Sequence, residues 1–321
     1  MSKRHPLKKY LFYLLPIIFL VLILLFPSQA RNGAASGLLL WFNVLLPTLL
    51  PFMILSDLIR RLHIVESVCH KISYRTGKNL YFLYPLSIGL LSGLPLGAKL
   101  TAEAVRSGQL SRKSGQFLLT VCNNSSTMFL IGYVAEVQLQ RPDLIGYFLL
   151  LIPLSSLLAA VLSAVICRFF SSILPHIPRS VTLVQNHTVR MTSLPVSNRS
   201  VSFIGSVSNS IMDSFTVLTQ VGGFVILFSV LSEFVLLIDS PIALPLVASL
   251  EMTTGVRAVC TSTLSQHAKT ILSAAAVSFT GLSGIAQTAC VLSETGLSLI
   301  QYTISRIISA VLCAVFFLFL L

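Results

Sequence analysis

The sequence predicts an all-α polytopic membrane protein with about seven spanning helices and two re-entrant helical hairpins, arranged as two inverted repeats. Three observations lead to this fold class. The chain of 321 residues is 55% apolar and only 10% charged, whereas soluble domains carry roughly 25% charged residues. Long apolar segments recur along the chain, and each half has one such segment that Gly, Pro or Glu interrupts. The basic residues gather in the short loops between these segments.

Uninterrupted apolar segments supply the spanning helices, since a crossing helix needs about 20 apolar residues. The seven segments are 10–27, 37–59, 115–134, 144–168, 212–238, 270–292 and 298–321. Residues 1–34 therefore hold an extra N-terminal transmembrane helix. Ser28-Gln29-Ala30 would suit a signal peptidase, but we expect an uncleaved span because the rest of the chain stays in the membrane.

The basic residues indicate how the interrupted segments 79–100 and 240–260 lie. If all nine segments cross, 11 basic residues fall on each side of the membrane. If both interrupted segments enter and leave on one side, 18 basic residues, with Arg306 among them, fall inside and 4 fall outside. Cytoplasmic loops carry the excess of Lys and Arg, so the count favours two hairpins.

With two hairpins, segments 37–59 and 212–238 run in opposite directions, which makes the halves inverted repeats. We place the first repeat at 35–170 and the second at 211–321. The Ser-, Thr-, Pro- and Asn-rich stretch 171–210 is expected to be a cytoplasmic linker, on the same side as the N-terminus of a multi-pass cell-membrane protein. Paired interruptions in two such halves indicate a transporter binding site.

The tip of the first hairpin carries Gly93, Pro95 and Gly97. Gly allows a tight reversal and Pro lacks a donor, so free backbone groups would lie near mid-membrane. The spacing of Gly89, Gly93 and Gly97 also suits close helix packing, but Pro95 favours a tip. Lys99 follows, either to hold an anionic substrate or to reach the cytoplasmic interface.

Asn123, Asn124 and Ser125 begin a run of five polar residues within an apolar segment. Such a run covers all sides of a helix, so some of its side chains must face protein or solvent. Amide and hydroxyl groups suit a polar ligand or an ion. The alternative is hydrogen bonding between helices.

Glu251, with Thr253 and Thr254 beside it, interrupts the second hairpin segment. A charge at mid-bilayer costs about 2.5–3.5 kcal/mol, so it usually has a partner or a function. The carboxylate is a candidate carrier of a coupling proton or cation. The alternative is an ion pair with Arg257 or Lys99.

Ser283 and Gln287 lie four residues apart, which puts them on one helical face opposite the Asn run. The stretch 281–284 also matches the GxSG of intramembrane serine proteases. That chemistry needs a His base on a neighbouring span, and all six His residues fall in loops or at span ends, none of them after Ser283. We therefore expect a binding site and no enzyme.

Other classes of function find no support in the sequence. There is no P-loop, HExxH or CxxC motif, so we expect no ATP hydrolysis, metal or cofactor. The net charge of +12 comes from loop residues and does not form a face that follows phosphates, so we expect no nucleic acid. The expected partners are the lipid bilayer and a small-molecule substrate, and a homo-oligomer is left open.

Four motifs in order resemble the Gate-domain (nucleoside recognition) family of membrane proteins, most closely its sporulation integral membrane protein group of the YlbJ/SpoVV type. They are Ser92 to Lys99, Cys122 to Ser125, Glu251 to Gly255 and Gly281 to Gln287. The resemblance implies a fold related to concentrative nucleoside transporters, with two hairpins meeting at mid-membrane. It also implies transport of dipicolinic acid during spore formation. Leu94 in place of the family Tyr and Ser126-Thr127-Met128 in place of a Gly/Asn-Pro step are departures.

Three functions follow from these observations. The first is transport of a small polar or anionic solute, with dipicolinate as the substrate that the resemblance implies. The second is nucleoside transport, against which the position of Trp41 near a span end counts, because nucleoside sites usually need an aromatic face. The third is a membrane scaffold that keeps the fold without transporting anything.

Overall fold

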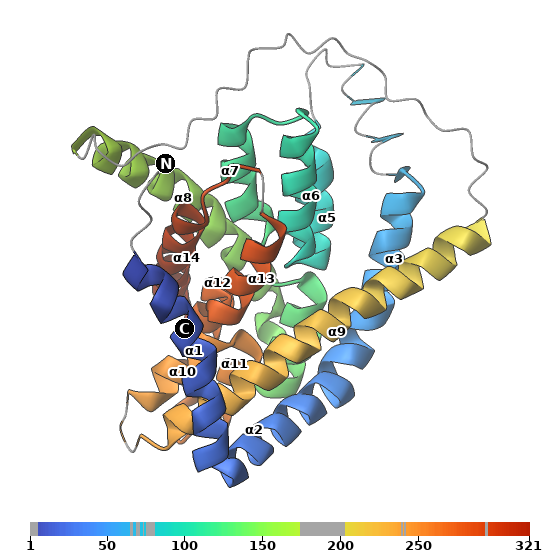
Figure 1. Ribbon diagram of the computed structural model, residues 1–321. Helices are drawn as coiled ribbons and strands as arrows, with labels where there is room; N and C mark the ends of the chain where they lie inside the picture. The colour runs from blue at the N-terminus through green and yellow to red at the C-terminus, as the bar shows by residue number, and fades with distance from the viewer. Residues whose placement is uncertain are drawn as a thin grey trace.

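The computed structural model describes residues 6–64, 67–68, 71–72, 74, 81–173, 203–238, 240, 242–292 and 295–321. All regular structure in these ranges is helical (Figure 1). The first half contains α1 (Pro6–Leu25), α2 (Pro27–Leu40), η1 (Trp41–Leu45), α3 (Leu46–Arg61), α5 (Leu83–Ser92), α6 (Leu96–Arg106), α7 (Arg112–Cys122), η2 (Phe129–Gln138), η3 (Pro142–Leu144) and α8 (Ile145–Ile173). The second contains α9 (Phe203–Leu236), α10 (Ala243–Leu250), α11 (Met252–Thr261), α12 (Gln266–Phe279), α13 (Gly281–Val291) and α14 (Leu299–Leu320).

The two halves present the same order of elements. Each begins with a long helix, formed by α2, η1 and α3 in the first half and by α9 in the second. A pair of short helices follows, α5 with α6 and α10 with α11. A helix broken in its middle comes next, α7 with η2 and α12 with α13. A long helix, α8 or α14, completes each half.

Five helices in the described ranges are long and apolar enough to cross a membrane: Pro27–Arg61, Pro142–Arg168, Phe203–Leu236, Gln266–Val291 and Leu299–Leu320. They account for five of the seven expected spans. The expected span 115–134 is not one continuous helix, because residues 123–128 separate α7 from η2. The first expected span lies in α1, of which Leu14–Leu25 is a shorter apolar stretch.

The predicted boundaries between the parts fall inside helices. Residues 35 and 211 lie within α2 and α9, which begin at Pro27 and Phe203. The last eight residues of the predicted linker are therefore helical, since apolar Phe203 and Ile204 start the helix and Ser206 and Ser210 share its buried face. Residues 171–173 of the predicted linker end α8, and 174–202 lie outside the described residues.

The two interrupted segments form helical hairpins. Each of their helices has 8 to 11 residues, about 12–17 Å of length, which cannot cross a 30 Å core alone. In each pair the two helices pack against each other. Gly93 turns the first hairpin with a φ of +73°, a conformation that suits glycine. Glu251 turns the second in extended conformation.

The first helix of each half packs along the other (Figure 1). Gly33 and Gly37, one turn apart on α2, face α9 so closely that a Cβ on Gly37 would lie 3.0 Å from the Cα of Ile226. Small residues at this spacing let helix backbones approach. Phe19 of α1 adds an edge contact to Phe234 at the end of α9. The remaining helices gather beside this pair (Figure 1).

Candidate functional site

In the first half, the hairpin tip docks into the break between α7 and η2. The backbone N–H of Leu94 donates to the carbonyl of Asn124 at 2.8 Å. A Cβ on Gly93 would lie 2.8 Å from the Cα of Ser126, so only glycine fits there. Gly89 and Gly97, on the two arms of the hairpin, pack on Cys122. The glycine spacing thus serves both the tip and close helix packing.

The second half repeats this contact between a tip and a break. Thr280 separates α12 from α13, and both Thr280 and the first residue of α13, Gly281, have left-handed φ angles, of 70° and 67°. A Cβ on Gly281 would lie 3.0 Å from the Cα of Glu251 and from the backbone nitrogen of Met252. Here the glycine belongs to the broken helix, whereas in the first half it belongs to the tip.

Glu251 is buried, with 3% of its surface exposed, and caps the N-terminus of α11. One carboxylate oxygen accepts from the backbone N–H of Thr254 at 2.7 Å and from its hydroxyl at 3.0 Å. The other accepts from the hydroxyl of Thr253 at 2.9 Å. A negative charge is favourable at a helix N-terminus. Within the described residues neither Arg257 nor Lys99 forms an ion pair with it, so the carboxylate is held by a cap.

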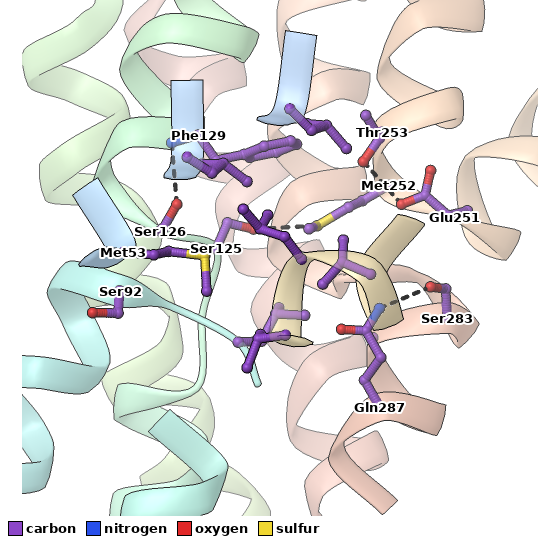
Figure 2. Close-up of a pocket in the computed structure, with 17 residues that line it drawn as sticks. Met53, Ser92, Ser125, Ser126, Phe129, Glu251, Met252, Thr253, Ser283 and Gln287 are labelled. Carbon is purple, nitrogen blue, oxygen red and sulfur yellow. Dashed lines mark hydrogen bonds between the residues drawn. The ribbon is translucent and has the colours of Figure 1, made fainter. Parts of the chain in front are cut away.

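The central pocket lies where both tips and both breaks meet (Figure 2). It has an empty volume of about 610 Å³, part of which is open to the outside. Its polar wall comes from both halves, and α3, η1 and α9 close it with apolar side chains. The lining residues are Leu45, Leu49, Met53, Ser92, Leu94, Ser125, Ser126, Phe129, Val217, Leu218, Val221, Glu251, Met252, Thr253, Ser283, Gly284 and Gln287.

Two polar atoms on the pocket wall have no hydrogen-bond partner within the described structure. They are the hydroxyl of Ser92, 6% exposed, and the side-chain oxygen of Gln287, 8% exposed. The amide nitrogen of Gln287 donates to Ser283 at 3.2 Å, and the hydroxyl of Ser125 has only weak contacts, with Met252 sulfur and a carbonyl at 3.4 Å. Unsatisfied buried polar groups are costly, so this wall is poised to accept a polar ligand.

Five of the predicted site residues line this pocket, namely Ser125, Glu251, Thr253, Ser283 and Gln287. Gly93, Pro95, Gly97 and Thr254 lie beside it and shape the tips. Lys99 is exposed on α6 and does not line the pocket. Its helical position turns it away from the tip, because Gly97, Ala98 and Leu100 occupy the packed face.

Asn123 faces the protein interior instead of the pocket. Its amide nitrogen donates to Thr288 at 2.8 Å and to the hydroxyl of Tyr302 at 2.9 Å. Its oxygen accepts from the backbone N–H of Ala98 at 3.1 Å. These bonds hold the break against α6, α13 and α14. Asn123 therefore fits the alternative interpretation of the polar run, hydrogen bonding between helices, and not a role in binding a ligand.

Asn124 also faces the protein interior, where it bonds to α8 and α14. Its amide nitrogen donates to the carbonyl of Val121 at 2.7 Å. Its oxygen accepts from Ser156 on α8 at 2.7 Å and from Arg306 on α14 at 2.5 Å. The side-chain hydrogen bonds of Asn124 therefore all go to groups inside the protein. The polar run divides into two interior asparagines, two pocket serines (Ser125 and Ser126) and Thr127, whose hydroxyl donates to the carbonyl of Leu91 at 3.2 Å.

Arg306 lies within α14, two turns from its start, and is fully buried, so it does not belong to the cytoplasmic side on which the topology count places it. Without it the count is 17 basic residues inside and 4 outside, which still favours the hairpins. A sequence signal exists: Tyr302, Arg306, Ser309 and Cys313 share one face of an otherwise apolar helix.

Ser92, Phe129 and the apolar lining residues from α3, η1 and α9 are pocket residues that were not predicted from the sequence. Ser92 begins the motif that runs to Lys99, but a single hydroxyl among apolar neighbours does not by itself indicate a binding residue. Among the described residues, no group of three or more His, Cys, Asp or Glu side chains could hold a metal ion.

The chain is similar to the sporulation integral membrane protein YlbJ of Bacillus subtilis (strain 168). The two share 28% identity over an alignment of 329 residues, which covers 92% of this chain and 78% of the relative. No family model and no solved structure matches the chain. The relative and the five apolar helices together make this a multi-pass integral membrane protein.

Proposed function

We propose that this protein is a membrane transporter of a small polar solute, which binds in the central pocket. The observation that supports this proposal most is the origin of the pocket wall. One hairpin tip and one helix break from each half supply it, and two buried polar atoms on it have no partner. Broken helices that meet between two repeats are the usual architecture of secondary transporter sites.

Dipicolinate, a planar dianion, is the first candidate solute. The relative is named for sporulation, and the resemblance described above implies this substrate. None of the residues that line the pocket is Lys, Arg or His. An anion would instead meet the N-terminus of α13, which has no side-chain cap and whose Ser283 and Gly284 reach the pocket. The N-terminal end of a helix favours negative charge.

Nucleoside transport is the second candidate, and the pocket gives it a specific reason. Phe129, 3% exposed, lines the pocket and stacks on Tyr133 with 5.0 Å between ring centroids. It supplies the aromatic surface that Trp41 does not. Glu251 and Gln287 on the opposite wall are groups that could bind a ribose.

The test is uptake by purified full-length protein in liposomes, with labelled dipicolinate and labelled uridine offered separately. Dipicolinate uptake that exceeds empty liposomes would support the first candidate, and uridine uptake the second. If neither solute enters under inward and outward proton and sodium gradients, both candidate substrates are excluded and the scaffold becomes the favoured function.

Two substitutions tie uptake to the pocket. Ser92→Ala and Gln287→Met remove the unpartnered atoms, and each is expected to raise the concentration for half-maximal uptake about fivefold. Ser87→Ala is the control for the first, since Ser87 lies on the same helix and bonds only to the carbonyl of Tyr84. Gln301→Met, on α14 away from the pocket, is the control for the second. If the variants and their controls change the concentration for half-maximal uptake equally, the pocket is not the site where the solute binds.

A further inference from the structure

Arg306 carries a positive charge into the centre of the protein without an acidic partner. Its two terminal nitrogens donate to the side-chain oxygen of Asn124 at 2.5 Å and to the carbonyl of Thr120 at 2.7 Å. Its third nitrogen has no partner. Its guanidinium carbon lies 5.4 Å from the ring centroid of Tyr302. Every contact is neutral, and within the described residues the ion pairs belong to other arginines.

An unpaired charge at this depth requires an explanation. A buried charge is normally paired, and intramembrane charges are rare and functional. If the helix break needed only a hydrogen-bond donor, a neutral side chain could supply it. Arg306 keeps its charge instead, in a low-dielectric interior where a fixed charge acts over several ångströms.

The guanidinium lies directly behind the pocket wall. Asn124 binds the guanidinium with its side-chain oxygen. The backbone carbonyl of Asn124 accepts a hydrogen bond from the backbone N–H of Leu94, and Ser125 is the next residue in the chain. Both Leu94 and Ser125 line the pocket. One residue therefore separates the positive charge from the cavity.

Glu251 is the acidic residue of the pocket wall, in the part that the second half contributes. Its oxygens are bonded to Thr253 and Thr254. No basic residue lines the pocket, so Arg306 is the buried positive charge nearest to the solute along this chain of contacts.

We propose that Arg306 determines which solute charge the pocket accepts, by balancing Glu251 from behind the wall. This inference rests on the proposed transport function. With both charges present the pocket has no net charge and admits an anion. Without the guanidinium, the carboxylate of Glu251 remains alone and repels anions, while a neutral solute of the same shape is unaffected.

The test compares two solutes of one shape, dipicolinate and its neutral diamide, pyridine-2,6-dicarboxamide. Uptake of both is measured in the same proteoliposomes for the wild type, Arg306→Gln, Arg306→Lys and the double variant Arg306→Gln with Glu251→Gln. The ratio of the two initial rates is the readout, because loss of folded protein lowers both rates and leaves their ratio unchanged.

The proposal expects Arg306→Gln to lower the ratio of dianion to diamide uptake by about tenfold or more. Arg306→Lys should keep the wild-type ratio, and the double variant should restore it. An unchanged ratio in Arg306→Gln, with both rates reduced equally, overturns the proposal and leaves Arg306 a brace for the helix break. Wild-type protein that takes up neither compound, nor uridine, overturns the transport function itself.

Discussion

Trp41 donates its indole N–H to the main-chain carbonyl of Leu218 at 2.8 Å, which joins the first helix of one half to the first helix of the other. The indole lies across Gly222, where a Cβ would come within 2.6–2.8 Å of three of its ring atoms. Gly223, the next residue, has open space on its outer side. Two adjacent glycines on α9 thus have opposite environments.

Gly222→Ala is expected to lower the thermal unfolding temperature in detergent, because the added methyl displaces the indole and its hydrogen bond, at a cost of about 1–3 kcal/mol. Gly223→Ala is the matched control and should be neutral or stabilising, since alanine favours a helix by about 1 kcal/mol over glycine. Equal effects of the two substitutions would contradict the packing of Trp41.

Asn124→Ala is expected to destabilise the protein by about 3 kcal/mol, because it leaves the buried guanidinium of Arg306 without its side-chain acceptor. Fluorescence-detected size exclusion after heating would show a loss of folded protein. Asn43→Ala, at an exposed position of η1, should have no effect. Wild-type stability together with lost uptake would instead return Asn124 to the substrate site.

Gly93→Ala should impair the first hairpin through two effects, the left-handed φ and the lack of space against Ser126. Gly108→Ala isolates the first effect, because Gly108 has a φ of +74° but no atom near a Cβ. We expect Gly108→Ala to cost about 1 kcal/mol and to leave uptake intact, and Gly93→Ala to abolish uptake. Uptake in proteoliposomes is measured for both variants. If the two variants transport equally well, the lack of space against Ser126 does not determine the conformation of the hairpin tip.

The topology predicts opposite labelling of two exposed positions, Ser107 at the end of α6 and Gln140 between η2 and α8. In a background without the native cysteines, Ser107→Cys should react with an impermeant maleimide only from the cytoplasmic side, and Gln140→Cys only from outside. Crossing of the membrane by all nine segments would reverse both results.

The sequence could predict the two hairpin tips because those positions contain residues that helices in lipid avoid. Gly93, Pro95 and Glu251 each interrupt an apolar segment, and each lies at a hairpin tip in the structure. The breaks at 123–128 and at Thr280 fall in segments that were expected to be continuous helices. Segment ends were less predictable. Polar residues such as Ser206 and Ser210 were assigned to a linker, whereas tertiary packing buries them on α9.

The site could be predicted only as far as helical periodicity holds. Ser283 and Gln287 lie within a regular turn of α13, so their spacing alone placed them on one face. Asn123 and Asn124 lie where the helix is broken, and no periodicity can assign their directions. Arg306 was counted on the cytoplasmic side although it lies within the expected span 298–321, because its partner Asn124 is far away in the sequence and only the fold brings the two together.

The pairing of α2 with α9 has a consequence for biosynthesis. The face of α2 that carries Gly33 and Gly37 is complete early in translation, but its partner on α9 ends only at Leu236. At about 5–20 residues per second, the ribosome needs roughly 10–40 s to supply that partner. During this interval the face of α2 that carries Gly33 and Gly37 lacks the helix that covers it in the folded protein, so this contact between the two halves forms only after most of the chain has been made.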